Sequence, residues 1–186
     1  MVIDQERCIG CDACSVACRI ENNTPNFLIT VKTQGGGQKD TPKGKYPNLE
    51  INFLPQTCNH CTNPPCVDSC PNEALIKRED GLVFLEKDLC TGCEACISAC
   101  PYGAIIFNKE NNLAEKCNLC SHRIDKGLEP FCVICCEGQA LFFGDLNDPN
   151  SKVSILISER NTFRLKLEKG TDPSVFYCPP KPKKRL

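Results

Sequence analysis

Apolar residues along this chain occur in short runs that predict strands, and polar or cysteine-rich stretches separate these runs. Strands are expected at residues 2–4, 81–85 and 104–107, with weaker candidates at 28–33 and 49–54. Residues 156–164 fit a helix of about two turns. No apolar run approaches the roughly 20 residues that cross a bilayer, so no direct membrane span is predicted.

Glycine, proline and lysine dominate two other parts of the chain. Residues 22–57 contain Gly35, Gly36 and Gly37 and the stretch KDTPKGKYP, which together predict a surface insert. The triple glycine predicts a flexible turn, because no strand–glycine–helix context for a phosphate surrounds it. The final residues PPKPKKRL predict a solvated tail, and the alternative is an arm that docks on a partner.

Cysteine changes this picture, because it supplies 18 of the 186 residues, a fraction close to that of a disulfide scaffold. No basic and apolar secretory signal and no twin-arginine segment precedes Cys8, so we expect synthesis in the reducing cytoplasm. Metal binding is favoured over disulfides in that compartment. The formal net charge of −1 provides no strongly basic surface, so no nucleic-acid partner is expected.

Most of the cysteines fall into four sets of four with regular spacing. The first and third sets have the spacing C-x2-C-x2-C-x3-C, the second C-x2-C-x4-C-x3-C and the fourth C-x2-C-x11-C-x3-C. In chain order the sets are Cys8, Cys11, Cys14 and Cys18; Cys58, Cys61, Cys66 and Cys70; Cys90, Cys93, Cys96 and Cys100; and Cys117, Cys120, Cys132 and Cys136. Cys135 and Cys178 are left outside the sets.

The third set is the bacterial ferredoxin run, in which the fourth cysteine binds the other cluster of a two-cluster unit. Three thiolates on one tight loop curl around an iron–sulfur cubane, and Gly10 and Gly92 ease this curl. The three residues between the third and fourth cysteines (the x3 step) carry the chain into a helical turn, so the fourth sulfur points toward a second cubane. Pro71 and Pro101 end that turn after the second and third sets.

Zinc is the main alternative, and it would make the chain a zinc-stabilised binding module. Zinc sites commonly use two separated C-x2-C pairs, and the fourth set taken alone would suit one. The C-x2-C-x2-C loops suit a cubane better. The sequence lacks a radical SAM triple, a P-loop and a dinucleotide fingerprint, so no catalytic residue is predicted. His60 and His122 lie beside cluster ligands, where packing or hydrogen bonding is the expected role.

These patterns predict an α+β fold made of two bacterial-ferredoxin-like 4Fe–4S pairs related by a pseudo-two-fold axis. Residues 58–100 would form an inner two-cluster unit, and residues 1–21 and 101–150 an outer one. Residues 22–57 would be the surface insert, and residues 151–186 a C-terminal extension for partner docking.

The cysteine-rich sequence resembles the four-cluster iron–sulfur subunits of the dimethyl sulfoxide reductase family of molybdopterin oxidoreductases. The segments that carry the resemblance are CIGCDACSVAC, CNHCTNPPCVDSCP, CTGCEACISACPYGAI, KCNLCSHRIDKGLEPFC, FGDLNDPNS and GTDPSVFYCPP. Relatives in this family serve polysulfide, thiosulfate, tetrathionate and arsenate reductases and some formate dehydrogenases. The resemblance covers essentially the whole chain and is specific for the subunit type, although it does not identify a substrate.

The resemblance implies four 4Fe–4S clusters held by cross-ligation. Its ligand sets are Cys8, Cys11, Cys14 and Cys136; Cys18, Cys117, Cys120 and Cys132; Cys58, Cys61, Cys66 and Cys100; and Cys70, Cys90, Cys93 and Cys96. The family usually has proline after the last ligand, whereas Glu137 follows Cys136 here. Cys136 preserves the x3 step and is therefore preferred over Cys135. Cys178 is expected to be a buried small apolar residue.

The implied function is electron transfer by a subunit that is not itself catalytic. Single electrons would pass between a large molybdenum or tungsten bis-pterin catalytic subunit and a second redox partner. That partner would be a quinol-linked membrane anchor subunit or a soluble electron donor. The alternative is a polyferredoxin-like adaptor of a hydrogenase or another soluble redox complex, although such an adaptor has no use for FGDLNDPNS and the C-terminal segment.

Bound clusters would change the charge and the docking properties of the chain. Four oxidised cubanes would shift the formal charge from −1 to about −9, which suits docking on basic patches. The insert at 22–57 and the tail after Gly170 are the expected docking surfaces. The chain's own signals predict the cytoplasm, and co-export with a signal-bearing partner would place it on the periplasmic face instead.

Overall fold

A computed structural model describes residues 1–35 and 38–181, so Gly36, Gly37 and the end of the lysine-rich tail lie outside the described residues. In chain order the elements are β1 (Val2–Asp4), α1 (Ala13–Glu21), β2 (Thr30–Gln34), β3 (Lys43–Lys45), β4 (Asn48–Glu50), β5 (Asn52–Gln56), α2 (Pro65–Asp68), β6 (Leu75–Lys77), β7 (Val83–Leu85), α3 (Ala95–Ala99), β8 (Ile105–Asn108), β9 (Leu113–Lys116), α4 (Ser121–Ile124), α5 (Phe131–Ile134), β10 (Leu141–Phe142), α6 (Lys152–Glu159) and β11 (Phe176–Cys178). Single turns of 3-10 helix occupy Lys87–Leu89 and Leu167–Lys169. This mixture of short helices and strands is consistent with the expected α+β class.

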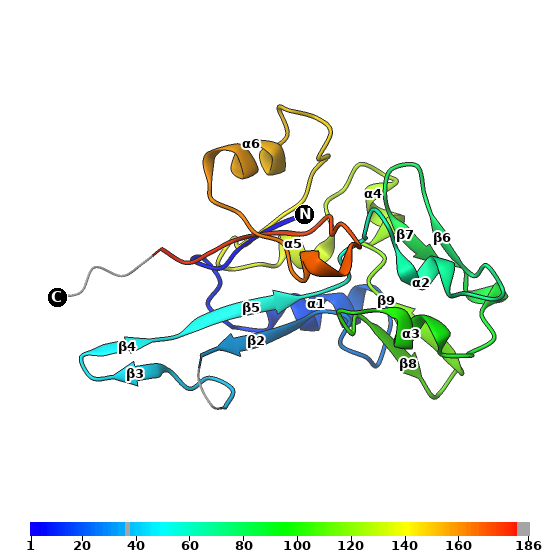
Figure 1. Cartoon of the computed structure of the whole chain (residues 1–186), viewed down its shortest axis with the longest axis horizontal. Helices are drawn as coiled ribbons and strands as arrows, with labels where there is room; N and C mark the ends of the chain where they lie inside the picture. The colour runs from blue at the N-terminus through cyan, green and yellow to red at the C-terminus, as the bar shows by residue number, and fades with distance from the viewer. Residues whose placement is uncertain (36–37, 182–186) are drawn as a thin grey trace.

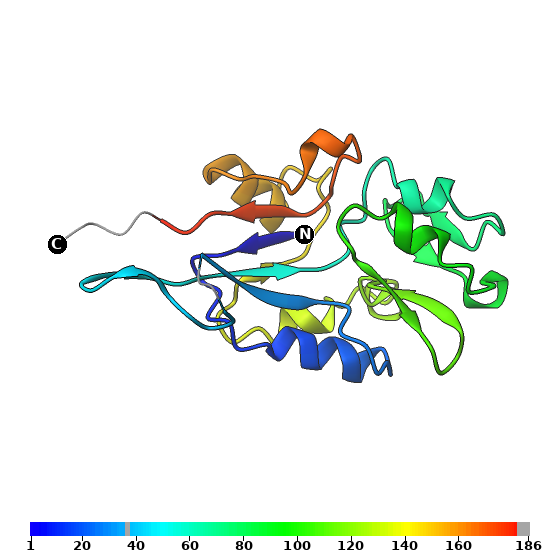
Figure 2. The same cartoon turned by 60° about the horizontal axis from the view of Figure 1, so that its bottom comes forward.

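A three-stranded sheet in the order β10–β1–β11 joins distant parts of the chain (Figure 1, Figure 2). β1 pairs antiparallel with β10, where Val2 lies opposite Phe142. It pairs parallel with β11, where Val2 lies opposite Phe176. The predicted strand at 2–4 is thus confirmed. Its pairing brings the residues just before the first cysteine set close to those just after the fourth.

The two faces of β1 enter different parts of the core, because successive side chains on a strand point to opposite faces. Ile3 packs with Leu141 and Tyr177 in the main buried cluster. Val2 packs with Val153 of α6 and with Cys178. Cys178 is fully buried, as expected of a small apolar residue.

Two antiparallel hairpins, β6–β7 and β8–β9, accompany the short helices. The strands predicted at 81–85 and 104–107 are present as β7 and β8. Leu75 and Val83 of the first hairpin share a buried cluster with Ile105 and Ala114 of the second. The two hairpins therefore pack together, although residue 100 was the expected boundary between the two units.

The segment 22–57 contributes to the core as well as to the surface. β2 and β5 pair along their length, and Ile29, Val31 and Leu54 lie in the main buried cluster. The hairpin β3–β4 instead extends away from the rest of the chain (Figure 1). The strand predicted at 49–54 is divided between β4 and β5. A wholly superficial insert therefore does not describe this segment.

Helix α6 lies earlier in the chain than the predicted span 156–164, so that prediction was wrong at both ends. The hydroxyl oxygen of Ser151 accepts a hydrogen bond from the Ser154 N–H at 3.2 Å, which caps the start of the helix. The helix ends at Glu159, and Phe163 forms an isolated β-bridge with Tyr177. Within the described ranges, every helix is too short or too polar to span a bilayer.

Tyr177 provides a test of the core. Its ring is fully buried and stacks on Phe163, and its hydroxyl donates to the Pro55 carbonyl at 3.0 Å. Tyr177→Phe removes this donor, so we expect the free energy of unfolding to fall by about 1–2 kcal/mol. A lower urea midpoint, followed by circular dichroism, would measure the loss. Tyr46→Phe is the control because Tyr46 is 88% exposed, and an equal loss in both variants would contradict this role.

Candidate iron–sulfur centres

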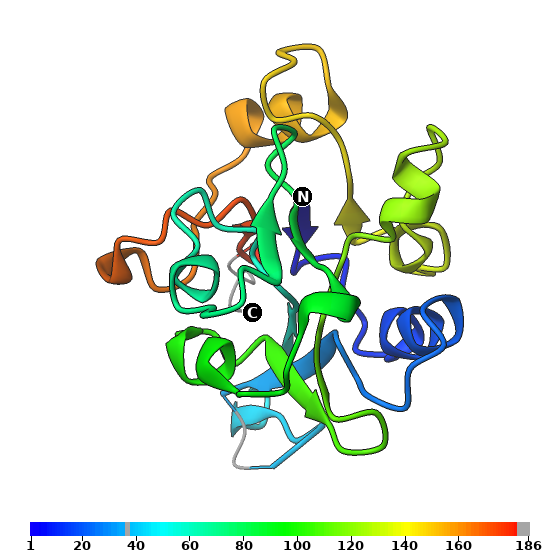
Figure 3. The same cartoon turned by 90° about the vertical axis from the view of Figure 1, so that its right-hand side faces the viewer.

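Four short helices organise the cysteine sets. Helices α1, α2, α3 and α5 contain Cys14 and Cys18, Cys66, Cys96, and Cys132 respectively. α1 packs against α5, which brings the first set to the fourth, and α2 packs against α3, which brings the second set to the third. Figure 3 shows α1 in blue on one side of the view and α2 and α3 in teal and green on the other.

Two cavities are each lined by all four cysteines of one predicted ligand set. The first cavity is lined by Cys8, Cys11, Cys14 and Cys136, together with Ile9, Val31 and Leu141. The second is lined by Cys58, Cys61, Cys66 and Cys100, together with Pro65, Val83 and Ile105. Each set draws thiols from two separate segments of the chain, as cross-ligation requires.

The other eight thiols form two further groups. Cys117 and Cys120 are neighbours of both Cys18 and Cys132, close enough to raise the pKa of each by charge repulsion in addition to burial. Burial is likewise the main cause that raises the pKa of Cys96, and Cys90, Cys70 and Cys93 add to it. The structure therefore brings together all four sets of thiols that the resemblance implies.

Burial disfavours loss of the proton from these thiols unless a cation is bound to them. Burial, with a smaller effect from neighbouring thiols, raises the pKa of Cys14, Cys18 and Cys66 to about 12. In the described part of the chain, no three His, Cys, Asp or Glu side chains are arranged to hold a single metal ion. The thiols of a set instead surround a space, and this donor set fits an iron–sulfur cubane.

Cys135 and Cys136 differ in their hydrogen bonding. The Cys136 sulfur accepts the Ala140 N–H at 3.2 Å, and the Cys70 sulfur accepts the Ala74 N–H at 3.3 Å in the same relative position. The Cys135 thiol donates to the carbonyl of Ala13 at 3.6 Å and lies outside the lining of the first cavity. This difference favours Cys136 as the ligand.

Two buried polar side chains lie beside the ligand set Cys58, Cys61, Cys66 and Cys100, called the Cys58 set below. His60 Nδ1 accepts the Val83 N–H at 3.0 Å, and burial lowers the pKa of His60 well below its ordinary value. The neutral ring therefore carries its proton on Nε2, which has no hydrogen-bond partner among the described residues. Both polar side-chain atoms of Asn59 are also without a partner there, and Asn59 lines the second cavity. Buried donors of this kind fit a bound group that carries sulfur acceptors.

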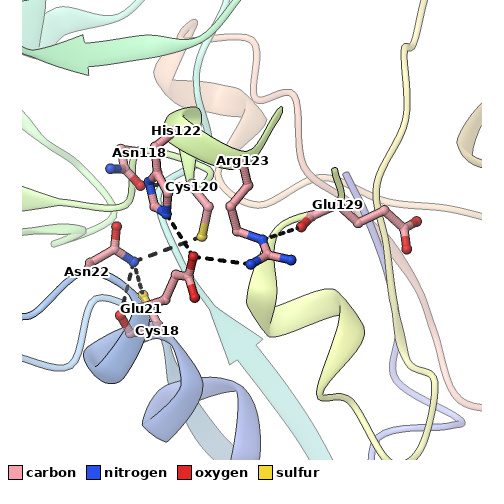
Figure 4. A network of polar contacts seen from close by, with 8 residues as sticks. All are labelled: Cys18, Glu21, Asn22, Asn118, Cys120, His122, Arg123 and Glu129. Carbon is pink, nitrogen blue, oxygen red and sulfur yellow. Dashed lines mark hydrogen bonds and ion pairs between the residues drawn. The ribbon is translucent and has the colours of Figure 1, made fainter. Parts of the chain in front are cut away.

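A polar network surrounds two thiols of the ligand set Cys18, Cys117, Cys120 and Cys132, called the Cys18 set below (Figure 4). Asn22 Nδ2 lies 3.7 Å from the Cys18 sulfur and 3.9 Å from the Cys120 sulfur. His122 is bonded to Glu21 at 2.7 Å, and this bond is the main cause that lowers the pKa of the Glu21 carboxyl. Sequence reasoning missed Asn22, because an asparagine four residues after a cysteine gives no signal by itself.

Gly92 tests how tightly the third loop is built. Its φ is 71°, and a Cβ there would lie 2.4 Å from the backbone oxygen of Asn112. Gly127 has a similar φ of 72° with nothing within 4 Å, so Gly127→Ala is the matched control. Since both substitutions incur left-handed strain but only Gly92→Ala clashes, we expect iron to be lost from Gly92→Ala alone. Iron analysis of the purified proteins would measure this, and equal iron in both would contradict it.

The chain is similar over most of its length to known iron–sulfur proteins. Residues 49–146 and residues 7–74 each match a family model described as a 4Fe–4S dicluster domain. The B subunit of tetrathionate reductase from Salmonella typhimurium is 44% identical, and the match covers 95% of this chain and 70% of that protein. The B component of polysulfide reductase from Wolinella succinogenes is 41% identical, and the match covers 97% of this chain and 94% of that protein.

A third relative extends the range of reductases. The arsenate respiratory reductase iron–sulfur subunit of a Shewanella species is 36% identical, and the match covers 95% of this chain and 94% of that protein. These matches agree with the resemblance seen in the sequence, and they do not favour the zinc module. This protein therefore belongs to the 4Fe–4S dicluster family of iron–sulfur electron-transfer subunits that includes the B subunits of tetrathionate, polysulfide and arsenate reductases.

Proposed function

We propose that this chain relays single electrons through four 4Fe–4S clusters between a molybdenum or tungsten pterin catalytic subunit and a second redox partner. The observation that carries the proposal is the gathering of sixteen thiols into four groups of four. The reversible transfer of one electron is the chemistry that a 4Fe–4S cluster supplies when bound.

The proposed ligands are the four cross-ligated sets. They are Cys8, Cys11, Cys14 and Cys136; Cys18, Cys117, Cys120 and Cys132; Cys58, Cys61, Cys66 and Cys100; and Cys70, Cys90, Cys93 and Cys96. The matching Ala74–Cys70 and Ala140–Cys136 hydrogen bonds support a pseudo-two-fold relation between the two units.

Exposure supports an order for the relay. Among the sixteen proposed ligands, only Cys11 and Cys93 are exposed, and they belong to different units. All four thiols of the Cys18 set are buried, and so are three of the four in the Cys58 set. The order would therefore run from the ligand set that contains Cys11 through the Cys18 and Cys58 sets to the ligand set that contains Cys93. Electrons would enter and leave at the two exposed loops.

The partners follow from the names of the relatives. Each of the three is named as one component of a reductase, the B component or the iron–sulfur subunit, which favours a separate catalytic subunit for this chain. The alternative of a polyferredoxin-like adaptor is not favoured, because the matches cover at least 95% of the chain and so include most of its C-terminal part.

Elemental analysis tests the relay and its partner together. The tagged chain, purified anaerobically from its native host, should contain about sixteen iron atoms, with additional molybdenum or tungsten from the catalytic subunit. Abundant iron without molybdenum or tungsten would support the adaptor instead. Zinc in place of iron would overturn electron transfer altogether.

A pair of adjacent cysteines tests the ligand assignment. Cys136→Ala removes a proposed ligand, so the iron content should fall and the spectrum of one cluster should change. Cys135→Ala is the matched control, because its thiol donates to backbone carbonyls, and this variant should keep its iron. Electron paramagnetic resonance and iron analysis would measure both. The reverse result would assign Cys135 as the ligand.

A further inference from the structure

Lys116 is a buried cation at the junction of the two units. It is the last residue of β9, it is 6% exposed, and it immediately precedes Cys117. Its ammonium group donates to the Cys117 carbonyl at 2.8 Å and also to the carbonyl of Val83 in β7. The side chain therefore reaches from the strand that leads into the fourth cysteine set to the hairpin that packs beside the second.

This ammonium group has no carboxylate partner within ion-pair distance in residues 1–35 and 38–181. The neighbouring Glu115 carboxylate lies on the other face of the strand, where it accepts hydrogen bonds from Thr24, Asn26 and Asn108. A buried charge is costly unless an opposite charge compensates for it. The compensating negative charge for Lys116 must therefore come from something other than a carboxylate.

Thiols of two different ligand sets lie within the electrostatic reach of Lys116. The Cys117 carbonyl accepts a hydrogen bond from Lys116, and so does the carbonyl of Val83, which lines the cavity of Cys58, Cys61, Cys66 and Cys100. The charge of Lys116 also opposes the rise in pKa that burial causes at Cys66 and Cys117. Cys58 is also a like-charge neighbour of Cys117, so the two sets approach each other at this point. Lys116 thus lies beside residues of the two sets that are most deeply buried.

We propose that Lys116 is the internal counter-charge of the two central clusters and raises the reduction potential of both. The inference rests on the proposed ligand sets. An oxidised cubane with four thiolates carries roughly −2 and gains a further negative charge on reduction, so a nearby fixed cation favours the reduced form. Lys116 would act through its positive charge while one electron leaves one cluster and enters the next. Its charge offsets the repulsion between two anionic clusters that meet at the junction of the units.

Three variants test whether the charge of the Lys116 side chain acts on the clusters, as distinct from its hydrogen bonding and its size. Lys116→Gln keeps a hydrogen-bond donor and removes the charge, whereas Lys116→Arg keeps the charge. Lys109→Gln removes an exposed charge from the turn of the same hairpin and is the matched control. Each complex would be purified anaerobically from the native host, analysed for iron, and titrated with redox mediators while electron paramagnetic resonance follows the clusters.

We expect Lys116→Gln to retain about sixteen iron atoms and to lower the midpoint potentials of two of the four clusters. A tenfold change in the ratio of reduced to oxidised cluster at fixed potential corresponds to about 59 mV for a one-electron couple. The other two midpoints should stay unchanged. All four midpoints should also stay unchanged in Lys116→Arg and in Lys109→Gln, because solvent screens the charge of Lys109.

Every other outcome decides between specific alternatives. Full iron with unchanged midpoints in Lys116→Gln, or an equal fall of all four, would overturn the role of Lys116 and leave the relay intact. Iron loss in Lys116→Gln but not in Lys116→Arg would support the counter-charge. Iron loss in both would overturn it in favour of a packing role. Too little iron in the unsubstituted protein would overturn the proposed relay itself.

Discussion

The pairing of β1 with both β10 and β11 is the interaction on which the arrangement of the thiols depends. The Asp4 N–H donates to the Ala140 carbonyl at 2.8 Å, and the Gln5 N–H donates to the Cys178 carbonyl at 3.0 Å. These contacts place the loop that begins at Cys8 beside the helix that precedes Cys136. Without the sheet, closing a chain segment of this length around one cavity would have to overcome a large loop entropy. The closure of the fold therefore brings the thiols of the first set next to Cys136 of the fourth.

Cysteine side chains fill much of the core that aliphatic side chains fill in other small folds. Cys14, Cys18 and Cys132 belong to the main buried cluster, and Cys66 and Cys96 belong to the second. The thiols that would hold the cofactors thus also occupy the interior of the protein. Binding of a metal cluster to such groups is coupled to folding, because a preformed site rarely exists in the unfolded chain. Under the proposed ligand sets, bound clusters would make the surroundings of the buried cation Lys116 anionic and so compensate its charge.

The spacing of the cysteines made the candidate sites predictable, because each x3 step places two thiols one helical turn apart, whatever the rest of the chain does. The apolar pattern also identified β1, β7 and β8, which have dense β-branched and aromatic residues. It misplaced α6, because the cap at Ser151 is a polar signal outside the apolar run. It also missed the contribution of β2 and β5 to the core. Asn22 and Lys116 were not predictable, because their roles come from contacts with residues distant in sequence.

The chain order of the ligand sets has a consequence for the biosynthesis of this protein. All eight cysteines of the second and third sets lie in residues 58–100, so a ribosome would expose all of them before it reaches the fourth set. The first set comes earlier in the chain, but under the proposed ligand sets it would need Cys136, and β1 also pairs with the later strand Phe176–Cys178. During synthesis the first loop therefore leaves the ribosome with reactive thiols and without its partner segment. Under the proposed ligand sets, cluster assembly at the first and fourth sets would therefore follow assembly at the second and third.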